Sequence, residues 1–301
     1  MRVKVIVNPA AGKPESVLSV LDSVFGPADI DWNVSITHKA GDGMKAARKA
    51  ADKGYDLIGA YGGDGTVSEV AAGLAEGGPP MLLLPGGTGN ALAEDLGIPV
   101  SLIEAAALAV GDAGTAKPVD LGRYGTRWFV QRMTMGFEAT MVHATTRKMK
   151  DRYGWLAYAL SALRSLSDPP MATYSMNIDG KAVECSGLAA LVANSASTGL
   201  PGVRIASDVD VSDGLLDVIV IEGDTLPMLL GSAVDAAQGI QPRALSRWRG
   251  KEIRVTGVPV QRMIADGEDA GRTPVEVSVA AGAIRVLVPK AGPTLDSTRT
   301  D

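Results

Sequence analysis

The segment GGDGT, residues 62–66, places one carboxylate among three glycines directly after the apolar run YDLIGAY. Glycines let a backbone approach a phosphate closely, and the start of a following helix offers free N–H groups and partial positive charge. A carboxylate beside phosphate must act through Mg²⁺ or accept a hydroxyl proton. Asp64 therefore suggests phosphoryl transfer. The alternative, which this segment alone leaves open, is a tight turn in which Asp64 caps a helix starting near Val67.

Two further glycine-rich segments, NPAAGK at 8–13 and PGGTGNALA at 85–93, stand in the same context. Each comes at the end of a short run rich in Val, Ile and Leu and precedes a helical pattern, so the first 120 residues repeat one strand, loop and helix unit three times. Such alternation predicts a parallel sheet covered by helices on both faces, with its loops meeting in one crevice at the carboxyl ends of the strands. Three loops at one crevice favour a nucleotide site. The sequence has neither the G-x-x-x-x-G-K-[ST] nor the G-x-G-x-x-G fingerprint, which argues against P-loop enzymes and dehydrogenases.

After about residue 120 the pattern changes to short alternating strands separated by turn residues, as in TYSMNIDGKAVECSGLAALVANS. We therefore predict an α/β fold with two domains. An N-terminal, three-layer parallel-sheet nucleotide domain covers 1–120, and a mainly β-sandwich domain covers 121–290. The polar residues 291–301 form a tail.

Composition excludes several classes of protein. The 301 residues include one cysteine and two histidines, which leaves no disulfide framework and little for a zinc site. A net charge of −5 argues against nucleic acid as a partner. Because no apolar run approaches about 20 residues and no signal peptide is indicated, we expect a cytoplasmic protein whose membrane contact is peripheral.

Four motifs in order, NPAAGK, GGDGTVSE, PGGTGNALA and DGLLDV (213–218), resemble the diacylglycerol kinase-like lipid kinases, which include sphingosine and ceramide kinases. The resemblance extends from the first strand to ADGE at 265–268. It implies an ATP-binding domain similar to those of NAD kinases and phosphofructokinases, a β-sandwich that carries the lipid site, and a catalytic cleft between them. The implied partners are a lipid alcohol, the membrane surface and, in some assemblies, a second copy of the chain.

The resemblance also implies roles for individual residues. Asp64 would lie at the phosphates and Mg²⁺, and Glu268 would be the general base. A second, structural Mg²⁺ would be held by the Asp213 carboxylate and the backbone carbonyls of Asp210 and Leu215. The implied ATP contacts are Asn8, Pro9, Ala10, Ala11, Gly12, Thr37, Gly62, Gly63, Asp64, Gly65, Thr66, Val67, Ser68 and Thr88.

The residues themselves allow simpler interpretations of several of these positions. Asp213 suits a Ser-Asp-Gly turn, and the ADGED segment around Glu268 suits a hairpin turn. Asp120, which matches an aspartate at the domain junction of the family, suits a turn at a strand end. The segment 147–158 mixes basic and aromatic side chains, which fits a membrane interface or a helix with a solvated face.

The third glycine loop departs from the bacterial diacylglycerol kinase pattern G-T-x-N-D-F-A-R, because Ala91 and Glu94 stand where that pattern has aspartate and arginine. The stretch GNALA is more similar to that of sphingosine kinases, so the resemblance implies an acceptor that is a lipid alcohol of diacylglycerol-like or sphingoid-like type. Two other functions stay open: a kinase of a soluble substrate, of NAD kinase type, and a nucleotide- or lipid-binding regulator without turnover.

Overall fold

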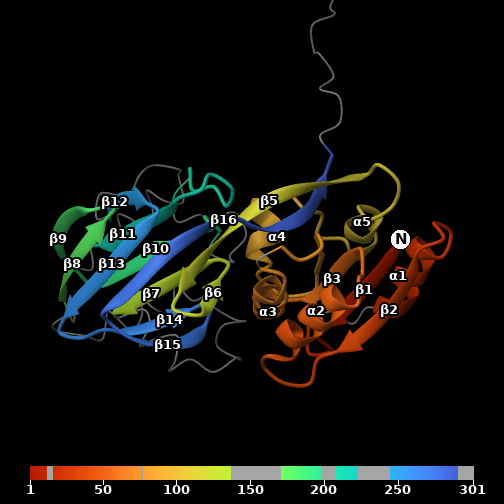
Figure 1. Ribbon diagram of the computed structural model, residues 1–301, viewed down its shortest axis with the longest axis horizontal. Helices are drawn as coiled ribbons and strands as arrows, with labels where there is room; N and C mark the ends of the chain where they lie inside the picture. The colour runs from red at the N-terminus through yellow and green to blue at the C-terminus, as the bar shows by residue number, and fades with distance from the viewer. Residues whose placement is uncertain are drawn as a thin grey trace, which may run out of the picture.

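The N-terminal half is built on four parallel strands in a computed structural model of the chain, which describes residues 1–11, 16–75, 77–136, 171–197, 206, 208–222 and 245–290 (Figure 1). The strands lie in the order β2-β1-β3-β4. Their bounds are β1 (Arg2–Val7), β2 (Asp31–Ile36), β3 (Leu57–Gly62) and β4 (Met81–Pro85). The predicted units around β1, β3 and β4 are confirmed.

A fourth unit, β2 followed by helix α2 (Asp42–Asp52), is not predicted from the sequence. β2 is the edge strand, and its residues DWNVSI alternate between exposed and half-buried positions, whereas β3 and β4 are buried throughout. An edge strand covered on one side needs no continuous apolar run, which is the signal that reveals the central strands.

The helices cover both faces of this sheet. Their bounds are α1 (Val17–Phe25), α2 (Asp42–Asp52), α3 (Asp64–Leu74), α4 (Ala91–Asp95) and α5 (Leu102–Ala107). The chain steps from β1 to β2 in one direction and from β2 to β3 to β4 in the other, so right-handed connections put α1 on one face and α2 with α3 on the opposite face. The direction reverses between β1 and β3, which is where ligands bind in open α/β sheets.

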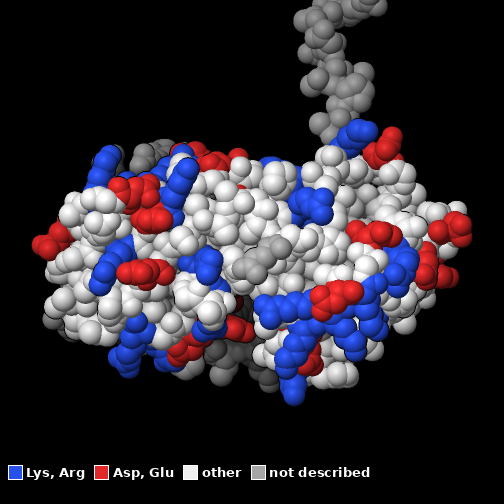
Figure 2. Space-filling model, in the orientation of Figure 1, with Lys and Arg blue, Asp and Glu red and all other residues white. Residues whose placement is uncertain are grey.

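Helices α2 and α3 pack closely because Gly73 has no side chain. A Cβ atom at this position would lie 2.6 Å from the Met44 carbonyl oxygen and 2.8 Å from the Ala47 Cβ atom. The opposite side of α2 is exposed and carries Lys45, Arg48 and Lys49. Figure 2 shows Lys and Arg side chains gathered over this helix, although the whole chain is acidic.

The second half is a β-sandwich, as predicted. One antiparallel sheet has the order β12-β11-β10-β7-β14-β15, and β16, β13, β8 and β9 form the facing layer. Side chains from both layers, among them Met133 of β7 and Met176 of β8, share one buried core. The strands are β5 (Gly114–Tyr124), β6 (Arg127–Phe129), β7 (Arg132–Gly136), β8 (Ala172–Ile178), β9 (Lys181–Gly187), β10 (Ala189–Ala193), β11 (Leu216–Ile221), β12 (Leu245–Gly250), β13 (Glu252–Val258), β14 (Arg262–Ala265), β15 (Glu268–Arg272) and β16 (Val275–Pro289).

The two halves share one sheet. The long strand β16 pairs with β13 and β5, and its Val286 also pairs with Met81 of β4, so ten strands form a continuous sheet through the molecule. Position 120 lies inside β5 rather than in a turn. The buried Asp120 carboxylate accepts hydrogen bonds from the backbone N–H groups of Gly214 at 2.6 Å and Gly282 at 2.7 Å. Asp120 therefore ties three separate segments together at the junction of the two halves.

Candidate active site

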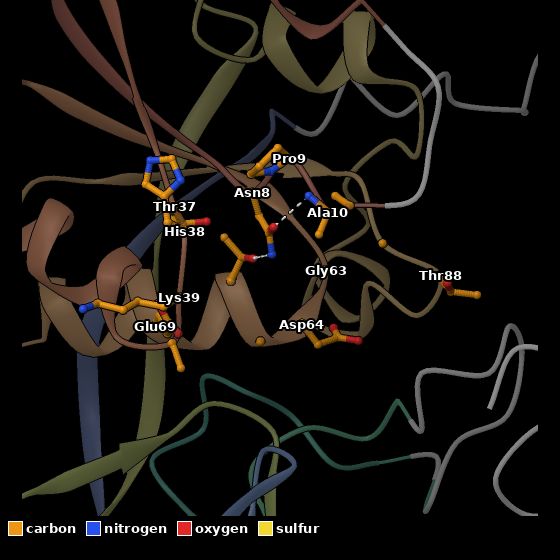
Figure 3. Close-up of a pocket in the computed structure, with 15 residues that line it drawn as sticks. Asn8, Pro9, Ala10, Thr37, His38, Lys39, Gly63, Asp64, Glu69 and Thr88 are labelled. Atoms are coloured by element: carbon orange, nitrogen blue, oxygen red, sulfur yellow. Dashed lines mark hydrogen bonds between the residues drawn. The ribbon is translucent and has the colours of Figure 1, made fainter. Parts of the chain in front are cut away.

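A pocket of about 710 Å³ opens at the carboxyl ends of the parallel strands (Figure 3). The loops after all four strands contribute to it, as expected from the position of the switch in strand order. The residues that line it are Asn8, Pro9, Ala10, Ala11, Thr37, His38, Lys39, Ala40, Gly63, Asp64, Gly65, Thr66, Glu69, Gly87 and Thr88.

The loop after β1 is held by the side chain of Asn8. Its Oδ1 atom accepts a hydrogen bond from the Ala10 backbone N–H at 3.0 Å, and its Nδ2 donates to the Thr66 hydroxyl at 3.0 Å. Both bonds are drawn in Figure 3. Asn8 thus shapes its own loop and joins it to the first turn of α3.

Helix α3 begins at Asp64, immediately after β3 and a single intervening glycine. The turn is so tight that a Cβ atom on Gly62 would lie 2.5 Å from the Thr66 hydroxyl oxygen. A helix start at the edge of a pocket directs unpaired backbone N–H groups toward an anion. The glycines of GGDGT therefore have the geometric role that phosphate binding requires.

Asp64 does not cap its own helix, so the capping interpretation is wrong: the cap position is Gly63, and no side-chain cap bond forms. Its Oδ1 atom instead accepts a 2.7 Å hydrogen bond from the Ala91 backbone N–H at the start of α4. Burial raises the pKa of the Asp64 carboxyl, the Ala91 bond lowers it, and the nearby Asp266 carboxylate raises it again, for a net upward shift. Because burial and a neighbouring negative charge disfavour the ionised form of Asp64, a cation bound beside it would stabilise that form.

The loop after β2 completes the pocket and was largely missed from sequence, where Thr37 alone was expected. His38, Lys39 and Ala40 follow Thr37 in this loop and also line the pocket. The Glu69 carboxylate fixes this loop by accepting hydrogen bonds from the Gly41 and Gly43 backbone N–H groups, each at 2.8 Å. The sequence signal that could have identified this loop is KAGDG, which contains glycines as the other three loops do and follows the strand DWNVSI.

The other expected ATP contacts fall in three groups. Asn8 to Ala11, Thr37, Gly63 to Thr66 and Thr88 line the pocket. Gly62, Val67 and Ser68 lie beside it in β3 and α3, outside its lining. Gly12 and the segment 147–158 lie outside the described residues, as does the tail 291–301.

The second half contacts helix α3, which begins at the pocket, through Asp266. Asp266 and Gly267 have positive φ angles and form the two-residue turn between β14 and β15, so the hairpin interpretation of ADGED is confirmed. The Asp266 carboxylate accepts bonds from the backbone N–H groups of residues 130–132 and a 2.7 Å bond from the Ser68 hydroxyl. The hairpin is thereby joined to α3, one turn beyond Asp64.

Glu268 follows this turn at the first position of β15. Its side chain is 60% exposed, and its Oε2 atom lies 3.4 Å from Nη2 of Arg127. The bond between Ser68 and Asp266 joins this hairpin to α3, but Glu268 itself is not among the described residues that line the pocket.

Helix α4 makes a second connection between the halves. The Ser197 hydroxyl donates to the Glu94 carboxylate at 2.6 Å, and the Ser195 hydroxyl donates to Asp95 at 2.5 Å. Glu94 is, with Ala91, one of the two residues noted above that depart from the bacterial pattern. In this chain it holds the third glycine loop against the sandwich.

At the other expected metal position, Asp213 makes an ion pair with Arg249 and accepts a 3.0 Å bond from the Leu215 backbone N–H. The Asp210 carboxylate binds Ser212 of the same turn. No group of three His, Cys, Asp or Glu side chains gathers into a metal site within the described ranges. A site with one carboxylate and two carbonyls is a different kind of site, so the Asp213 ion stays a prediction.

Comparison with known proteins places these observations in a family. Residues 2–124 match the family model of the diacylglycerol kinase catalytic domain, and residues 131–288 match that of the YegS C-terminal NAD kinase beta sandwich-like domain. The chain is 30% identical to a diacylglycerol kinase of Bacillus subtilis (strain 168) over 295 residues, covering 96% of this chain and 97% of that one.

A probable lipid kinase YegS-like protein of Pseudomonas aeruginosa (strain PAO1) is 33% identical over 269 residues, or 87% of this chain and 86% of its own. A crystal structure of a diacylglycerol kinase from Bacillus anthracis str. Sterne superposes with a TM-score of 0.80 at 25% identity, over 96% of this chain and 97% of that one. The fold and the site therefore define a kinase. The chain belongs to the diacylglycerol kinase-like lipid kinase family.

None of the helices in the described parts of the chain is long and apolar enough to span a membrane.

Proposed function

We propose that this kinase transfers the γ-phosphoryl group of ATP to a hydroxyl of a lipid alcohol, of diacylglycerol-like or sphingoid-like type. The observation that carries the proposal is the pocket in which four loops and the start of α3 surround Asp64, opposite the hairpin that carries Glu268. Phosphoryl transfer depends mainly on positioning and electrostatic stabilisation, and this arrangement supplies both.

The residues at the phosphate end of the pocket fit Mg²⁺. Asp64 contributes a hard oxygen donor, and Mg²⁺ commonly binds one or two carboxylates together with phosphate oxygens and water. When bound, Mg²⁺ would neutralise charge on the phosphates. Asn8 and the glycines order the surrounding loops, the N–H groups at the start of α3 bind phosphate oxygens, and Thr88 faces the same space (Figure 3).

Glu268 is the proposed general base. It would accept the proton of the lipid hydroxyl as that oxygen attacks phosphorus, and its exposed position in the hairpin leaves it accessible to a substrate that approaches from the membrane. The Arg127 guanidinium lies beside this carboxylate, with Nη2 at 3.4 Å from Oε2.

The deciding experiment is incubation of a cellular lipid extract with the enzyme, Mg²⁺ and γ-labelled ATP, followed by mass spectrometry of the products. The proposal predicts a lipid phosphate monoester, absent with the Asp64→Asn variant. Phosphorylation of NAD with no labelled lipid would instead favour the soluble-substrate kinase. ATP binding without transfer to any acceptor would favour a regulator.

Peripheral membrane binding is a further part of the proposal, and the exposed basic side of α2 supports it, because Lys45, Arg48 and Lys49 would attract anionic lipid. Sedimentation with anionic vesicles should decrease after charge reversal of these three residues, and added salt should weaken binding. Charge reversal of the exposed Lys181, Lys251 and Lys290 is the matched control. Size-exclusion chromatography with light scattering would test the predicted homodimer.

A further inference from the structure

Arg132 is a half-buried cation at the first position of β7 that the motifs do not identify. Successive side chains of a strand point to opposite faces. Met133 and Met135 both belong to the sandwich core. Met133 therefore points into the sandwich, and Arg132 points to the opposite face of the sheet.

Both ends of Arg132 are fixed. Its backbone N–H donates to the Asp266 carboxylate at 3.1 Å, and its carbonyl oxygen accepts the Asp266 N–H at 3.1 Å. At the other end, Nη1 donates to the Ser197 carbonyl oxygen at 2.9 Å. Asp266 and Ser197 are the residues through which the sandwich contacts α3 and α4, so the Arg132 side chain extends between the two connections.

Asp64 lies between the same two connections. Ser68, which binds Asp266, is one turn along α3 from Asp64, and Ala91, which binds Asp64 directly, is on the same short helix as Glu94. Among the groups that act on the Asp64 carboxyl, the positive charge of Arg132 and a hydrogen bond from the neighbouring Gln131 both lower its pKa. The positive charge of Arg132 therefore acts on Asp64 from the sandwich side, although Arg132 is outside the described lining of the pocket.

The pocket needs such a cation. Lys39 is the only Lys or Arg among the described residues that line it, whereas Asp64 and Glu69 add negative charge. A triphosphate brings several further negative charges. Lys39 lies on the loop after β2, which is a different part of the pocket rim from Asp64 (Figure 3).

We propose that Arg132 is a further catalytic residue, an inference that rests on the proposed function. Its guanidinium contacts the equatorial oxygens of the γ-phosphoryl group as transfer proceeds. The bond from phosphorus to the β,γ-bridging oxygen breaks and its electron pair leaves with ADP. The lipid oxygen forms the new bond, and its proton passes to Glu268. Planar guanidinium donors match the spread negative charge of this transition state better than an ammonium does.

The test compares wild type, Arg132→Ala and Arg132→Lys in two measurements. In lipid phosphorylation, Arg132→Ala should lower kcat by about 10² to 10³, with little change in KM for ATP, because the contact forms mainly in the transition state. Guanidinium ion added to the buffer should restore part of the rate of Arg132→Ala. Arg132→Lys, which keeps the charge and the backbone bonds, should retain an intermediate rate.

The second measurement needs no lipid. Calorimetry with Mg²⁺ should show that ADP binds wild type and Arg132→Ala alike, whereas ADP with aluminium fluoride, a mimic of the transferring phosphoryl group, binds Arg132→Ala at least tenfold more weakly. Equal losses of affinity for both ligands, or no loss for either, would overturn the proposal and leave Arg132 as a brace between the halves. Arg254→Ala removes another strand arginine with a carboxylate neighbour and is the matched control.

If wild type phosphorylates no lipid, the proposed acceptor is wrong, and the comparison of ADP with ADP and aluminium fluoride still decides the role of Arg132. If it phosphorylates lipid and Arg132→Ala is as fast, the acceptor stands and the role of Arg132 is refuted. Thermal melting of each variant separates these outcomes from unfolding.

Discussion

The pocket formed by the glycine loops and the part of the sandwich that faces it are built in different ways. The pocket consists of loops from neighbouring parallel strands, held to one another by short hydrogen bonds such as Asn8 to Thr66 and Glu69 to Gly41. That part of the sandwich, called the opposite wall below, consists of the β14–β15 hairpin with Glu268 and the start of β7 with Arg132. Among the described hydrogen bonds, the wall reaches the first half through Ser68 with Asp266 and through the α4 residues with Ser195 and Ser197.

This difference suggests that the two parts have separate functions, with binding in the pocket and catalysis dependent on the opposite wall. The pocket is ordered within one half, so the proposed nucleotide binding should depend little on the exact placement of the other half. The proposed base and Arg132 depend on how closely the halves approach. Changes in the pocket should therefore alter nucleotide binding, and changes in the opposite wall should alter turnover with binding nearly intact.

The largest effect on turnover is expected from Glu268→Gln, which preserves shape and removes basicity. If Glu268 accepts the hydroxyl proton, kcat should fall by roughly 10² to 10⁴ while ATP affinity, measured by calorimetry, stays near wild type. Glu276→Gln is a close control, because Glu276 is also an exposed glutamate with an arginine nitrogen at 3.4 Å, that of Arg254. Turnover within twofold of wild type would remove Glu268 from the mechanism.

Asp64→Asn should lower activity by at least ~100-fold, because a metal ligand or its charge is lost. Asparagine still accepts the Ala91 hydrogen bond, so folding should survive. In contrast to Glu268→Gln, this variant should also bind Mg²⁺-ATP more weakly, since Asp64 belongs to the pocket. Asp112→Asn, at an exposed site far along the chain, controls for loss of one negative charge. Near-normal activity of Asp64→Asn would show that the charge is not used.

The same division governs what the sequence could reveal. The glycine loops were predictable because each strand, loop and helix unit occupies only 15 to 24 consecutive residues, and local patterns carry that information. The edge strand β2 was missed because partial exposure removes its apolar run. The contacts of Asp266 with Ser68 and with residues 130–132 join positions more than 130 residues apart, and nothing local in ADGED distinguishes a surface hairpin from one that carries a catalytic group. Glu268 was found only through family resemblance, and Arg132 only through the structure.

Chelation of metal should separate the two interpretations of Asp213. If Asp213 holds a structural ion, EDTA should lower the melting temperature of wild type by several degrees through loss of a ligand that binds the folded state. The Asp213→Ala protein should melt lower and respond little to EDTA. If Asp213 acts only through its Arg249 ion pair, EDTA should have no effect, and Arg249→Ala should melt at the same temperature as Asp213→Ala.

A smaller effect on stability should follow from the raised pKa of Asp64. Its unfolded-state pKa is about 3.9, and burial and Asp266 raise the folded-state value. Ionisation of Asp64 therefore costs the folded state more than the unfolded state. The free energy of unfolding is highest while the carboxyl is protonated in both states, and it falls as pH rises through the folded-state pKa. In metal-free buffer, Asp64→Asn should melt at a higher temperature than wild type at pH 8, because asparagine removes the cost of ionising a buried carboxyl. The difference should shrink toward pH 4, and a constant difference would contradict the pKa shift.

The smallest effect, and the most direct test of the division, is expected from Ser68→Ala. The family resemblance counts Ser68 as an ATP contact, whereas its hydroxyl donates to Asp266 across the cleft. If Ser68 serves mainly to hold the hairpin against α3, its loss should lower kcat several-fold and leave KM for ATP unchanged, because the Asp266 carboxylate keeps its three backbone donors and the hairpin is only loosened. If Ser68 instead binds nucleotide, KM for ATP should rise with kcat unchanged. Ser23→Ala, which removes an exposed helical hydroxyl bonded to its own helix, is the matched control.

A double variant with Glu268→Gln adds a second criterion. Because the effects of coupled sites are non-additive, Ser68→Ala should have little further effect on kcat once the proposed base that it helps to position is gone.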